Sequence, residues 1–515
     1  MWQNILSAVE KVNGAINDFV WGIPMIVMIL GTGLLLTIRT RFLQVRKFGE
    51  SLSTTIVPTI RSIGKSKKKT GDAKTISQFE AFSAAISGTI GTGNIIGVSS
   101  AILTGGPGAV FWMWVSAFVG MVTNYSENVL GLYFRKKDKH GNLSGGPMYY
   151  ISEGIHQNWL AYLAAAFCLL AAISMSGVQA NKITGTITEV VGNSVSDDAR
   201  KILSLVIGIV IAVLIALIVI GGIKRIGRIA SILVPFMSVL FIVMALILIC
   251  MHINHIGSAF AMIFSNIFSF KAAFGGVGGY AFGKIIQKGL ARGVFSNEAG
   301  LGSSVIAHSA SETKEPVKQG LWGIFEVFLD TFVICTLTAL VILTSYSASD
   351  LYVLGANGNV TGAMTDAAAS LGAFANLGAF GRIAFAVIIP LFAFTTILAW
   401  SYYGEKSTEF IFRRTGERGQ KIAATCFKVI YVLLIVVFSV IDGELVWAIS
   451  DTANGLMALP NLICLICLSG LVAKITKNYF DRKAGKSVAP MLSAYPERNE
   501  ELIRELQEEH KNAGE

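Results

Sequence analysis

Two glycine-rich stretches combine flexible backbone with polar side chains that can bind a small charged molecule. The first, AAISGTIGTGNIIGVSS, places Thr92, Gly93 and Asn94 within a run that holds four glycines. The second, AAFGGVGGYAFGK, holds five glycines ahead of Lys284. Where a helix unwinds, its free N–H groups can bind a carboxylate, and its free carbonyls can bind an ammonium group or a small cation. The two stretches therefore predict a site for a zwitterion and a monovalent cation, or, as the alternative, close helix packing through small residues.

Further uncharged polar residues lie within apolar runs and can line such a site. Gln179, in SMSGVQANK, is expected to face a pore or else to join two helices. Thr395 and Thr396 lie mid-span, where hydroxyls often bond back to carbonyls of their own helix. Trp400 follows Thr396 by four residues and shares its helical face. Trp400 is therefore a candidate for the wall of a cavity, with simple packing as the alternative.

Glu127, Glu326 and Asp330 are the acidic residues that fall within apolar runs, where carboxylates are costly and usually functional. Arg135 follows Glu127 by eight residues, so an ion pair between them is the expected arrangement. Glu326 and Asp330 are four residues apart and would share one helical face. These two carboxylates can relay protons, which keeps proton coupling open as an alternative to a metal cation.

Membrane helices are needed to bring these residues together. Of 515 residues, 53% are apolar and 14% are charged, whereas soluble domains carry about 25% charged residues. This composition excludes an ordinary water-soluble enzyme. A run of about 20 apolar residues is long enough to span a bilayer. Eleven such spans are expected, at residues 19–38, 77–103, 108–134, 158–190, 202–221, 229–251, 270–306, 320–345, 383–403, 421–441 and 445–473.

The distribution of basic residues predicts how the chain crosses the membrane. The net charge of +10 arises from short Lys and Arg clusters between apolar runs, and the linker 39–74 alone holds ten of them. Positively charged residues in short loops stay on the cytoplasmic side. We therefore expect the N-terminus outside and the C-terminus in the cytoplasm. The positive charge marks this topology rather than nucleic-acid binding.

Neither a disulfide framework nor a metal centre of His and Cys ligands is expected. All six cysteines lie in or beside apolar runs. Cys464 and Cys467 form a C-x-x-C at lipid depth, where helix packing is the expected role. His252 and His255 end an apolar run without an acidic neighbour that would complete a metal site.

The spans after the first divide into two groups of five, and each group begins with a glycine-rich helix. Matching interruptions in two halves indicate a transporter site at the interface of a repeat. Because each half has an odd number of spans, the halves run in opposite directions. We expect an extra helix with a basic linker at 1–76, repeats at 77–251 and 252–473, and a cytoplasmic tail with a short amphipathic helix at 474–515.

Four segments resemble the signature of the alanine/glycine:cation symporter family, the sodium-coupled alanine carriers of bacteria and archaea. They are SGTIGTGNIIGV at 87–98, GGPGAVFWMWVSAFVGMVTNYSENVLGLYFRKKDKHGNLSGGPMYYI at 105–151, RGVFSNEAGLGSSVIAH at 292–308 and LFAFTTILAWSYYGEK at 391–406. The resemblance implies an all-α polytopic membrane fold, in which a leucine-transporter-type five-plus-five inverted repeat follows one extra N-terminal helix. It also implies a location in the plasma membrane of a prokaryote.

The resemblance implies which residues bind substrate and sodium. Asn94 and the unwound backbone beside it would hold the carboxylate of an amino acid. The expected substrate-binding residues are Thr92, Gly93, Asn94, Gln179, Gly279, Phe282, Thr396 and Trp400. The expected sodium ligands are the carbonyls of Ser87 and Ile90 and the hydroxyls of Thr395 and Thr396. Gly300 and Gly302, in SNEAGLGS, are the alternative position for the second break, in place of 275–283.

The expected function is secondary active import of a small neutral amino acid, alanine or glycine, coupled to sodium by alternating access. A channel would need a continuous polar stripe or a filter ring. A membrane enzyme would need a nucleophile–base pair or a metal cluster, and no motif indicates one. No catalytic residue or organic cofactor is expected, and the partners are the amino acid, Na⁺ and the lipid bilayer. The preference among alanine, glycine and a D-isomer, the ion stoichiometry and the oligomeric state stay open.

Overall fold

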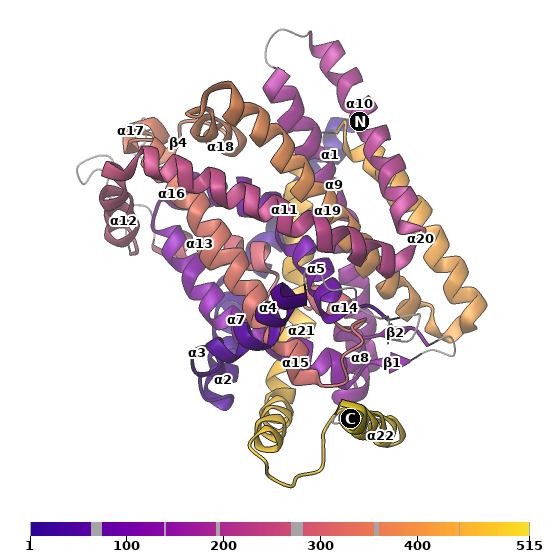
Figure 1. Ribbon diagram of the computed structural model, residues 1–515. Coiled ribbons are helices and arrows are strands. Elements are labelled where there is room, and N and C mark those ends of the chain that lie inside the picture. The colour runs from indigo at the N-terminus through magenta and orange to yellow at the C-terminus, as the bar shows by residue number, and fades with distance from the viewer. Residues whose placement is uncertain are drawn as a thin grey trace.

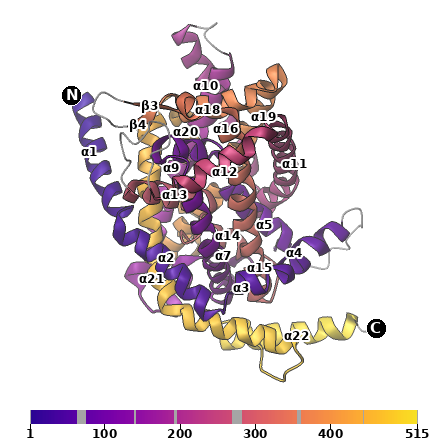
Figure 2. The same cartoon turned by 90° about the vertical axis from the view of Figure 1, so that its left-hand side faces the viewer.

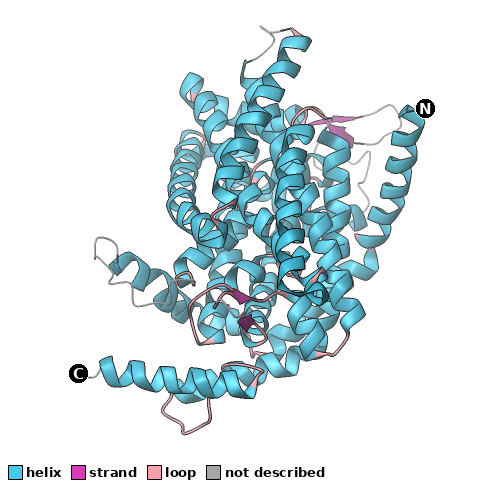
Figure 3. Ribbon diagram, turned by 90° about the vertical axis from the view of Figure 1, so that its right-hand side faces the viewer, coloured by secondary structure: helices cyan, strands magenta, loops and turns pink. Residues whose placement is uncertain are grey.

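The computed structural model describes residues 2–62, 75–137, 141–191, 196–268, 282–354, 360–441 and 443–513. Within these ranges nearly all regular structure is helical, and two short strand pairs lie toward opposite ends of the bundle (Figures 1 and 3). A helix satisfies its own backbone hydrogen bonds, which a chain needs inside a bilayer. The expected all-α class is confirmed.

The described residues up to Ser265 form twelve α-helices and one strand pair. The helices are α1 (Trp2–Val20), α2 (Ile23–Arg39), α3 (Leu43–Arg46), α4 (Phe48–Ser62), α5 (Gln78–Thr89), α6 (Ile96–Gly105), α7 (Ala109–Tyr133), α8 (Pro147–Gly154), α9 (Asn158–Val191), α10 (Asp197–Val219), α11 (Gly222–Met251) and α12 (Ile256–Ser265). The 3₁₀ turns are η1 (Thr92–Asn94) and η3 (Ile253–His255). The antiparallel strands are β1 (Lys136–Lys137) and β2 (Leu143–Ser144).

The second part continues with longer helices and the other strand pair. The helices are α13 (Phe282–Asn297), α14 (Ser304–His308), α15 (Pro316–Val327), α16 (Thr336–Ser345), α17 (Ala348–Leu351), α18 (Asp366–Ala375), α19 (Gly378–Ile411), α20 (Gly416–Phe438), α21 (Gly443–Lys483) and α22 (Pro496–Ala513). A π-helical segment, η4 (Phe328–Cys335), joins α15 to α16, and η5 (Arg413–Thr415) is a 3₁₀ turn. The antiparallel strands are β3 (Tyr352–Leu354) and β4 (Val360–Gly362).

Seven helical segments in the described residues are long and apolar enough to span a membrane, and an eighth span arises if the bent pair α1 and α2 is counted as one. These segments coincide with eight of the expected runs. The other three expected runs correspond to the pair α5 and α6, to α7, and to the pair α13 and α14. None of these helices is by itself both long and apolar enough to count as a membrane span. The total of eleven spans and the repeat therefore stay predictions.

The first glycine-rich stretch interrupts a helix, as expected. α5 ends at Thr89, α6 begins at Ile96, and the 3₁₀ turn η1 lies between them. The N–H of Ile90 still donates to the Ile86 carbonyl at 2.8 Å, so the chain leaves the helix directly after this residue. All residues of this break are buried. Unwound backbone at membrane depth is tolerated because protein surrounds it.

The second break lies around Gly300 and Gly302, between α13 and α14. In it, Glu298, Gly300 and Gly302 have φ angles of 55°, 91° and 76°. Glycine adopts such left-handed backbone without steric cost, which explains the two glycines. The stretch 275–283 is not the break that the structure describes. Its first seven residues lie outside the described part, and its last two are helical in α13.

Long helices surround both breaks. α9 packs along α19 and α21, α7 packs against α13 and α15, and α5 contacts α11, α14 and α19. Buried apolar side chains fill the spaces between these helices in two large clusters. The broken helices are thus held inside the bundle, where their free backbone groups can face one another.

The two chain ends lie at opposite ends of the bundle (Figure 2). α1 starts near one end, whereas α22 lies across the other end as a separate helix. Leu502, an apolar residue of this tail helix, is 3% exposed. The predicted amphipathic helix therefore exists, and its apolar face packs against the rest of the molecule.

Candidate functional site

Gln179 of α9 lies against the first break. Its Oε1 accepts hydrogen bonds from the Thr92 amide at 3.4 Å and from the Thr92 hydroxyl at 3.1 Å. Its Nε2 is buried and has no acceptor among the described residues. A buried donor without an acceptor costs free energy, so this Nε2 is available to an oxygen of a ligand. The structure therefore brings Gln179 and Thr92, both expected to bind substrate, together at the break.

Thr396 of α19 faces the last turn of α5. Its hydroxyl lies 3.0 Å from the Ser87 carbonyl and 2.9 Å from the Phe392 carbonyl of its own helix. A Cβ atom on Gly91 would lie 2.7 Å from the Thr396 hydroxyl, so glycine is needed for this close approach. Thr396, Ser87 and the unwound backbone after Ile90 therefore form a cluster of neutral oxygens.

Thr395, the other threonine expected to bind sodium, points to a different helix. Its hydroxyl donates to the carbonyls of Leu391 at 3.2 Å and Phe392 at 3.0 Å. The same hydroxyl lies 3.8 Å from the sulfur of Met237 in α11. Neighbouring residues on a helix point about 100° apart. Of the two threonines, the structure brings Thr396 and not Thr395 to Ser87.

Asn94 joins the first break to Asp330. Its Oδ1 accepts the Gly91 N–H at 2.9 Å, and its Nδ2 lies 2.5 Å from Asp330 Oδ1. The other carboxylate oxygen of Asp330 accepts the hydroxyls of Ser296 at 2.9 Å and Thr331 at 2.8 Å. The Asn94 amide is therefore engaged on both sides. Asp330, suggested by the sequence only as a proton relay, connects the first break with the end of α13.

Glu298 lies in the second break and contacts Trp400. Trp400 Nε1 donates to Glu298 Oε1 at 3.1 Å, and the Ser303 hydroxyl donates to Glu298 Oε2 at 2.5 Å. All three residues are buried. The SNEAGLGS segment thus supplies, through Glu298, the carboxylate that orients the Trp400 indole.

Phe295 is the aromatic residue of α13 that reaches the first break. A Cβ atom on Gly93 would lie 3.2 Å from the Phe295 ring, and Phe295 stacks on Trp447 with ring centroids 5.3 Å apart. Phe282, in contrast, is the first residue of α13. It lies roughly 22 Å from the end of this helix by helical rise. The backbone of Phe282 thus lies at the opposite end of α13 from the break, and the Phe282 side chain and Gly279 lie outside what the structure describes.

Glu127 contacts α21 and does not form the expected ion pair with Arg135. Asn461 Nδ2 lies 2.5 Å from Glu127 Oε1 and 2.8 Å from the Gly300 carbonyl in the second break. The side-chain oxygen of Asn461 accepts a hydrogen bond from the Tyr150 hydroxyl. Arg135 instead donates to backbone carbonyls beyond α14. The ion-pair prediction is wrong because the carboxylate turns into the bundle and the guanidinium turns toward its end.

Asn461→Ala should destabilise the protein by at least about 2 kcal/mol, because it leaves a buried carboxylate, a carbonyl and a hydroxyl without their hydrogen-bond partner. Asn454→Ala is the matched control. Asn454 lies on the same helix, but its amide reaches only the Met175 sulfur, at 3.7 Å. Thermal unfolding of the detergent-purified protein compares the two variants. Equal losses for both would show that Asn461 does not hold the second break.

Glu326 and Asp330, four residues apart, contact different partners in the structure. Glu326 Oε2 lies 2.7 Å from His308 Nε2, and Gln319 Nε2 lies 2.6 Å from His308 Nδ1. Asp330 belongs to the π-helical segment η4 and contacts Asn94 at the first break. The two carboxylates therefore belong to separate hydrogen-bond clusters.

The residues around the two breaks are enclosed by protein. The exposed fraction is at most 1% for Thr92, Asn94, Gln179, Thr396 and Trp400. Among the described residues, no group of three or more His, Cys, Asp or Glu side chains is arranged to hold a metal. The arrangement offers neutral oxygens and free N–H groups. These groups suit the binding of a zwitterion and an alkali cation.

An ion pair joins α13 to α21 on the side of the site that faces α1. Arg292 Nη1 lies 3.0 Å from Asp451 Oδ1, and the Arg292 guanidinium lies over the ring of Trp447, 5.1 Å from its centroid. Trp447 in turn stacks on Phe295 beside the first break. This contact therefore links α13 and α21 beside the first break.

Comparisons with known proteins agree along most of the chain. The model of the sodium:alanine symporter family matches residues 6–492. The sodium/alanine symporter AgcS of Methanococcus maripaludis is 39% identical over 465 residues, which cover 90% of this chain and 96% of that protein. An uncharacterized transporter of Haemophilus influenzae is 39% identical over 476 residues, which cover 92% of this chain and 97% of that protein.

The fold also has a solved counterpart. The crystal structure of MhsT in complex with L-phenylalanine superposes with a TM-score of 0.54 at 16% identity, covering 79% of this chain and 99% of that chain. At this identity the likeness concerns the fold, and it agrees with the expected leucine-transporter type. The family is one of membrane transporters and not of enzymes. The chain belongs to the sodium:alanine symporter family.

Proposed function

We propose that this chain imports a small neutral amino acid, alanine or glycine, together with sodium, by alternating access around the two helix breaks. The observation that carries the proposal is the buried Gln179 Nε2, which has no acceptor among the described residues and lies beside the unwound backbone at Thr92. Gln179 Nε2 and the free N–H groups of this backbone can bind a carboxylate without an arginine. The proposal agrees with the family and with the named relative.

The substrate carboxylate would be held at the first break. Gln179 Nε2 and the N–H groups around Gly93 are its donors, and the Phe295 ring covers Gly93. The ammonium group would take carbonyls freed at the breaks and the Glu298 carboxylate in the second break. Trp400, fixed by Glu298, limits the space for the side chain. Asn94 would position this backbone through Gly91 and would not contact the substrate itself.

Sodium would lie between α5 and α19. The Ser87 and Ile90 carbonyls and the Thr396 hydroxyl supply neutral oxygens, and the 3.0 Å contact from Thr396 to Ser87 supports the assignment. The hydroxyl that now donates to the Ser87 carbonyl would turn its lone pair to the ion. Thr395 would join these ligands only if α19 rotated, because its hydroxyl lies beside Met237.

Proton coupling is the second candidate, and Asp330 favours it. This carboxylate is fully buried and accepts hydrogen bonds from Asn94, Ser296 and Thr331 on both sides of the site. A buried carboxylate that joins two movable segments is suited to change its proton with the transport cycle. Transport driven by a proton gradient without sodium would select this alternative.

The proposed orientation places the N-terminus outside and the C-terminus in the cytoplasm of a prokaryotic cell. The opposite positions of the two ends in Figure 2 support an odd number of crossings. The basic linker 39–74 supports a cytoplasmic position for the end that carries α22. The segment 1–76, the repeats 77–251 and 252–473, and the tail 474–515 remain the proposed divisions.

Uptake into proteoliposomes tests the proposal. Labelled alanine should accumulate above its external concentration when a sodium gradient points inward, and the accumulation should collapse when an ionophore removes the gradient. Unlabelled glycine should compete. Equilibration without accumulation would contradict active transport, and accumulation that needs only a proton gradient would contradict sodium as the coupling ion.

Trp400→Ala should widen the range of transported amino acids. Trp400 is fully buried and held by Glu298, so its removal opens space of roughly the size of a leucine side chain. Leucine should then compete with alanine for uptake, whereas it should not compete in the unmodified protein. Competition by leucine that is equally strong in both proteins would contradict a wall formed by Trp400.

A further inference from the structure

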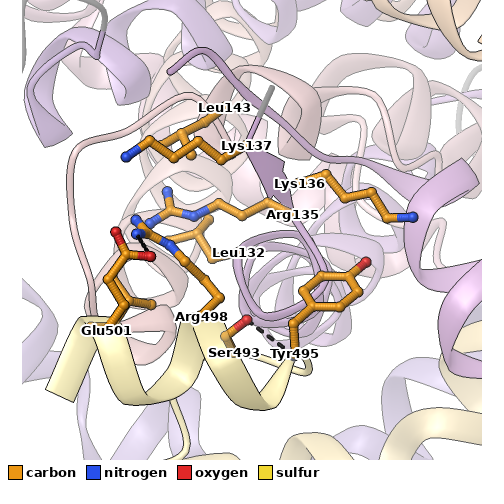
Figure 4. Close-up of a pocket in the computed structure, with 10 residues that line it drawn as sticks. Leu132, Arg135, Lys136, Lys137, Leu143, Ser493, Tyr495, Arg498 and Glu501 are labelled. Carbon is orange, nitrogen blue, oxygen red and sulfur yellow. Dashed lines mark hydrogen bonds and ion pairs between the residues drawn. The ribbon is translucent and has the colours of Figure 1, made fainter. Parts of the chain in front are cut away.

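A cleft separates the tail helix α22 from the end of α7. It consists of two cavities of about 320 Å³ and about 520 Å³. The cavities share five lining residues and are therefore adjacent. The shared residues are Arg135, Lys137, Leu143, Arg498 and Leu502. The tail helix α22, which forms one wall of the cleft, lies at the end of the bundle that carries the C-terminus (Figure 2), and Figure 4 shows the residues that line the smaller cavity.

The smaller cavity is strongly basic. Four cationic side chains line it, those of Arg135, Lys136, Lys137 and Arg498, against the single carboxylate of Glu501. Figure 4 shows the guanidinium groups of Arg135 and Arg498 turned toward one another, with Lys137 extended beside them. Like charges repel at short range, so this grouping is favourable when an anion lies among them.

Arg135 is a buried cation without a carboxylate partner among the described residues. Its guanidinium donates to the carbonyls of Ser309 at 3.3 Å, Ser311 at 2.6 Å and Thr313 at 2.6 Å. Burial, and then the charge of Arg498, lower the pKa of Arg135 to about 9. Three carbonyls and the more distant charge of Glu505 offset the burial of this cation only in part, so a negatively charged ligand beside it would stabilise the arrangement.

Nearby carboxylates balance the positive charge of Arg498 only in part. Its Nη1 lies 2.5 Å from Glu501 Oε2 and 3.7 Å from Glu505 Oε1, yet this buried nitrogen makes no well-aligned hydrogen bond among the described residues. Glu505 is shared with Lys314, at 3.0 Å. Lys137 forms no ion pair with a described carboxylate. Arg135 and Lys137 on one wall of the cleft thus have no carboxylate partner among the described residues, whereas Arg498 on the other wall pairs with Glu501 and, more distantly, with Glu505.

We propose that this cleft binds a phosphate group, which Arg135, Lys137 and Arg498 hold between α22 and the end of α7. Guanidinium groups present paired N–H donors that match the oxygens of a phosphate. Because Arg135 also holds the segment after α14, a bound phosphate fastens the tail helix to the chain that follows the second break. The phosphate belongs either to the headgroup of an anionic phospholipid or to a small soluble compound.

Thermal unfolding of the full-length protein in a neutral detergent tests the site. Sodium phosphate is titrated against sodium chloride at equal sodium concentration, and choline chloride brings the chloride series to the same ionic strength, so that effects of sodium and of screening cancel. A ligand that binds the folded protein raises its unfolding temperature in a saturable way. We expect this rise in the unmodified protein, with a midpoint at least about tenfold higher in Arg498→Gln and in Lys137→Gln.

Arg504→Gln is the matched control on the same helix. The Arg504 side chain is 77% exposed and lies outside the cleft, so this variant should respond to phosphate as the unmodified protein does. Lys137→Gln changes a surface lysine and keeps the test valid if Arg498→Gln fails to fold.

A second titration distinguishes the two sources of the phosphate. It uses short-chain phosphatidylglycerol, with phosphatidylcholine of the same chain length as reference. A saturable rise with phosphatidylglycerol alone assigns the site to a lipid headgroup, and a rise with inorganic phosphate as well assigns it to a soluble ligand. No saturable rise with either probe, or an equal rise in Arg498→Gln and Lys137→Gln, overturns the proposal.

Discussion

Replacing Asn94 with alanine is expected to lower sodium-driven alanine uptake by at least about tenfold, because a hydrogen bond to a charged group contributes about 1.5–3 kcal/mol. The Asn94 amide accepts the Gly91 N–H and donates to Asp330, and so it fixes the unwound backbone relative to η4. Without it, the N–H groups of the first break lose their orientation toward the substrate. The measurement is initial uptake of labelled alanine into proteoliposomes, normalised to the reconstituted protein.

Asn181→Ala is the matched control for this experiment. Asn181 lies two residues beyond Gln179 on α9, but its amide donates to the Ile441 carbonyl at 2.7 Å, away from the first break. Its loss should change the alanine concentration for half-maximal uptake by less than about twofold. Wild-type rate and wild-type alanine affinity in Asn94→Ala would show that Asn94 does not position the site.

Thr396→Val should raise the sodium concentration for half-maximal uptake at least about tenfold, whereas Thr395→Val should change it by less than about threefold. Valine keeps the shape of threonine and removes the hydroxyl. In Thr396 this hydroxyl lies 3.0 Å from the Ser87 carbonyl, and in Thr395 it bonds back to its own helix. A sodium titration of alanine uptake measures both variants.

The two threonines control for one another, because they are neighbours on one helix and receive the same substitution. Alanine binding at saturating sodium should change little in either variant, which separates the loss of an ion ligand from general damage. An unaltered sodium curve in Thr396→Val would reject the site between α5 and α19. A larger shift in Thr395→Val than in Thr396→Val would show that α19 presents the other face to the ion.

The first half of the candidate site follows from the sequence. Glycines around Thr92 and Asn94 predict unwound backbone, because few other residues tolerate it inside a membrane. Gln179 and Thr396 are polar residues in otherwise apolar spans, and such residues tend to face a functional interior. The structure places Gln179 on Thr92 and Thr396 on Ser87. Residue type and depth therefore indicated the break and Gln179, whereas Thr396 was expected mainly from the family resemblance.

The second half could not be predicted from the same signals. The stretch 275–283 is richer in glycine than SNEAGLGS, yet the described break lies at Gly300 and Gly302, where glycine adopts left-handed backbone. Glycine number does not show which residue must have a positive φ angle. Phe295 gave no signal either, because an aromatic residue in an apolar helix is usually part of the core.

Contacts between distant segments account for the remaining differences. Glu127 meets Asn461, which lies 334 residues later in the chain, and spacing along one helix cannot show such a partner. Asp330, in the π-helical segment η4, contacts Asn94, whereas Glu326 contacts His308. The sequence pattern assumed a regular α-helix through this region.

Sodium flux driven by an alanine gradient tests the central claim of coupled transport most directly. Proteoliposomes would contain equal sodium on both sides, with the membrane potential clamped at zero and alanine added only outside. The account predicts net entry of radioactive sodium that depends on alanine and is strongly reduced in Thr396→Val. Alanine entry without sodium entry, accompanied instead by proton entry, would contradict sodium coupling and would assign the coupling to Asp330.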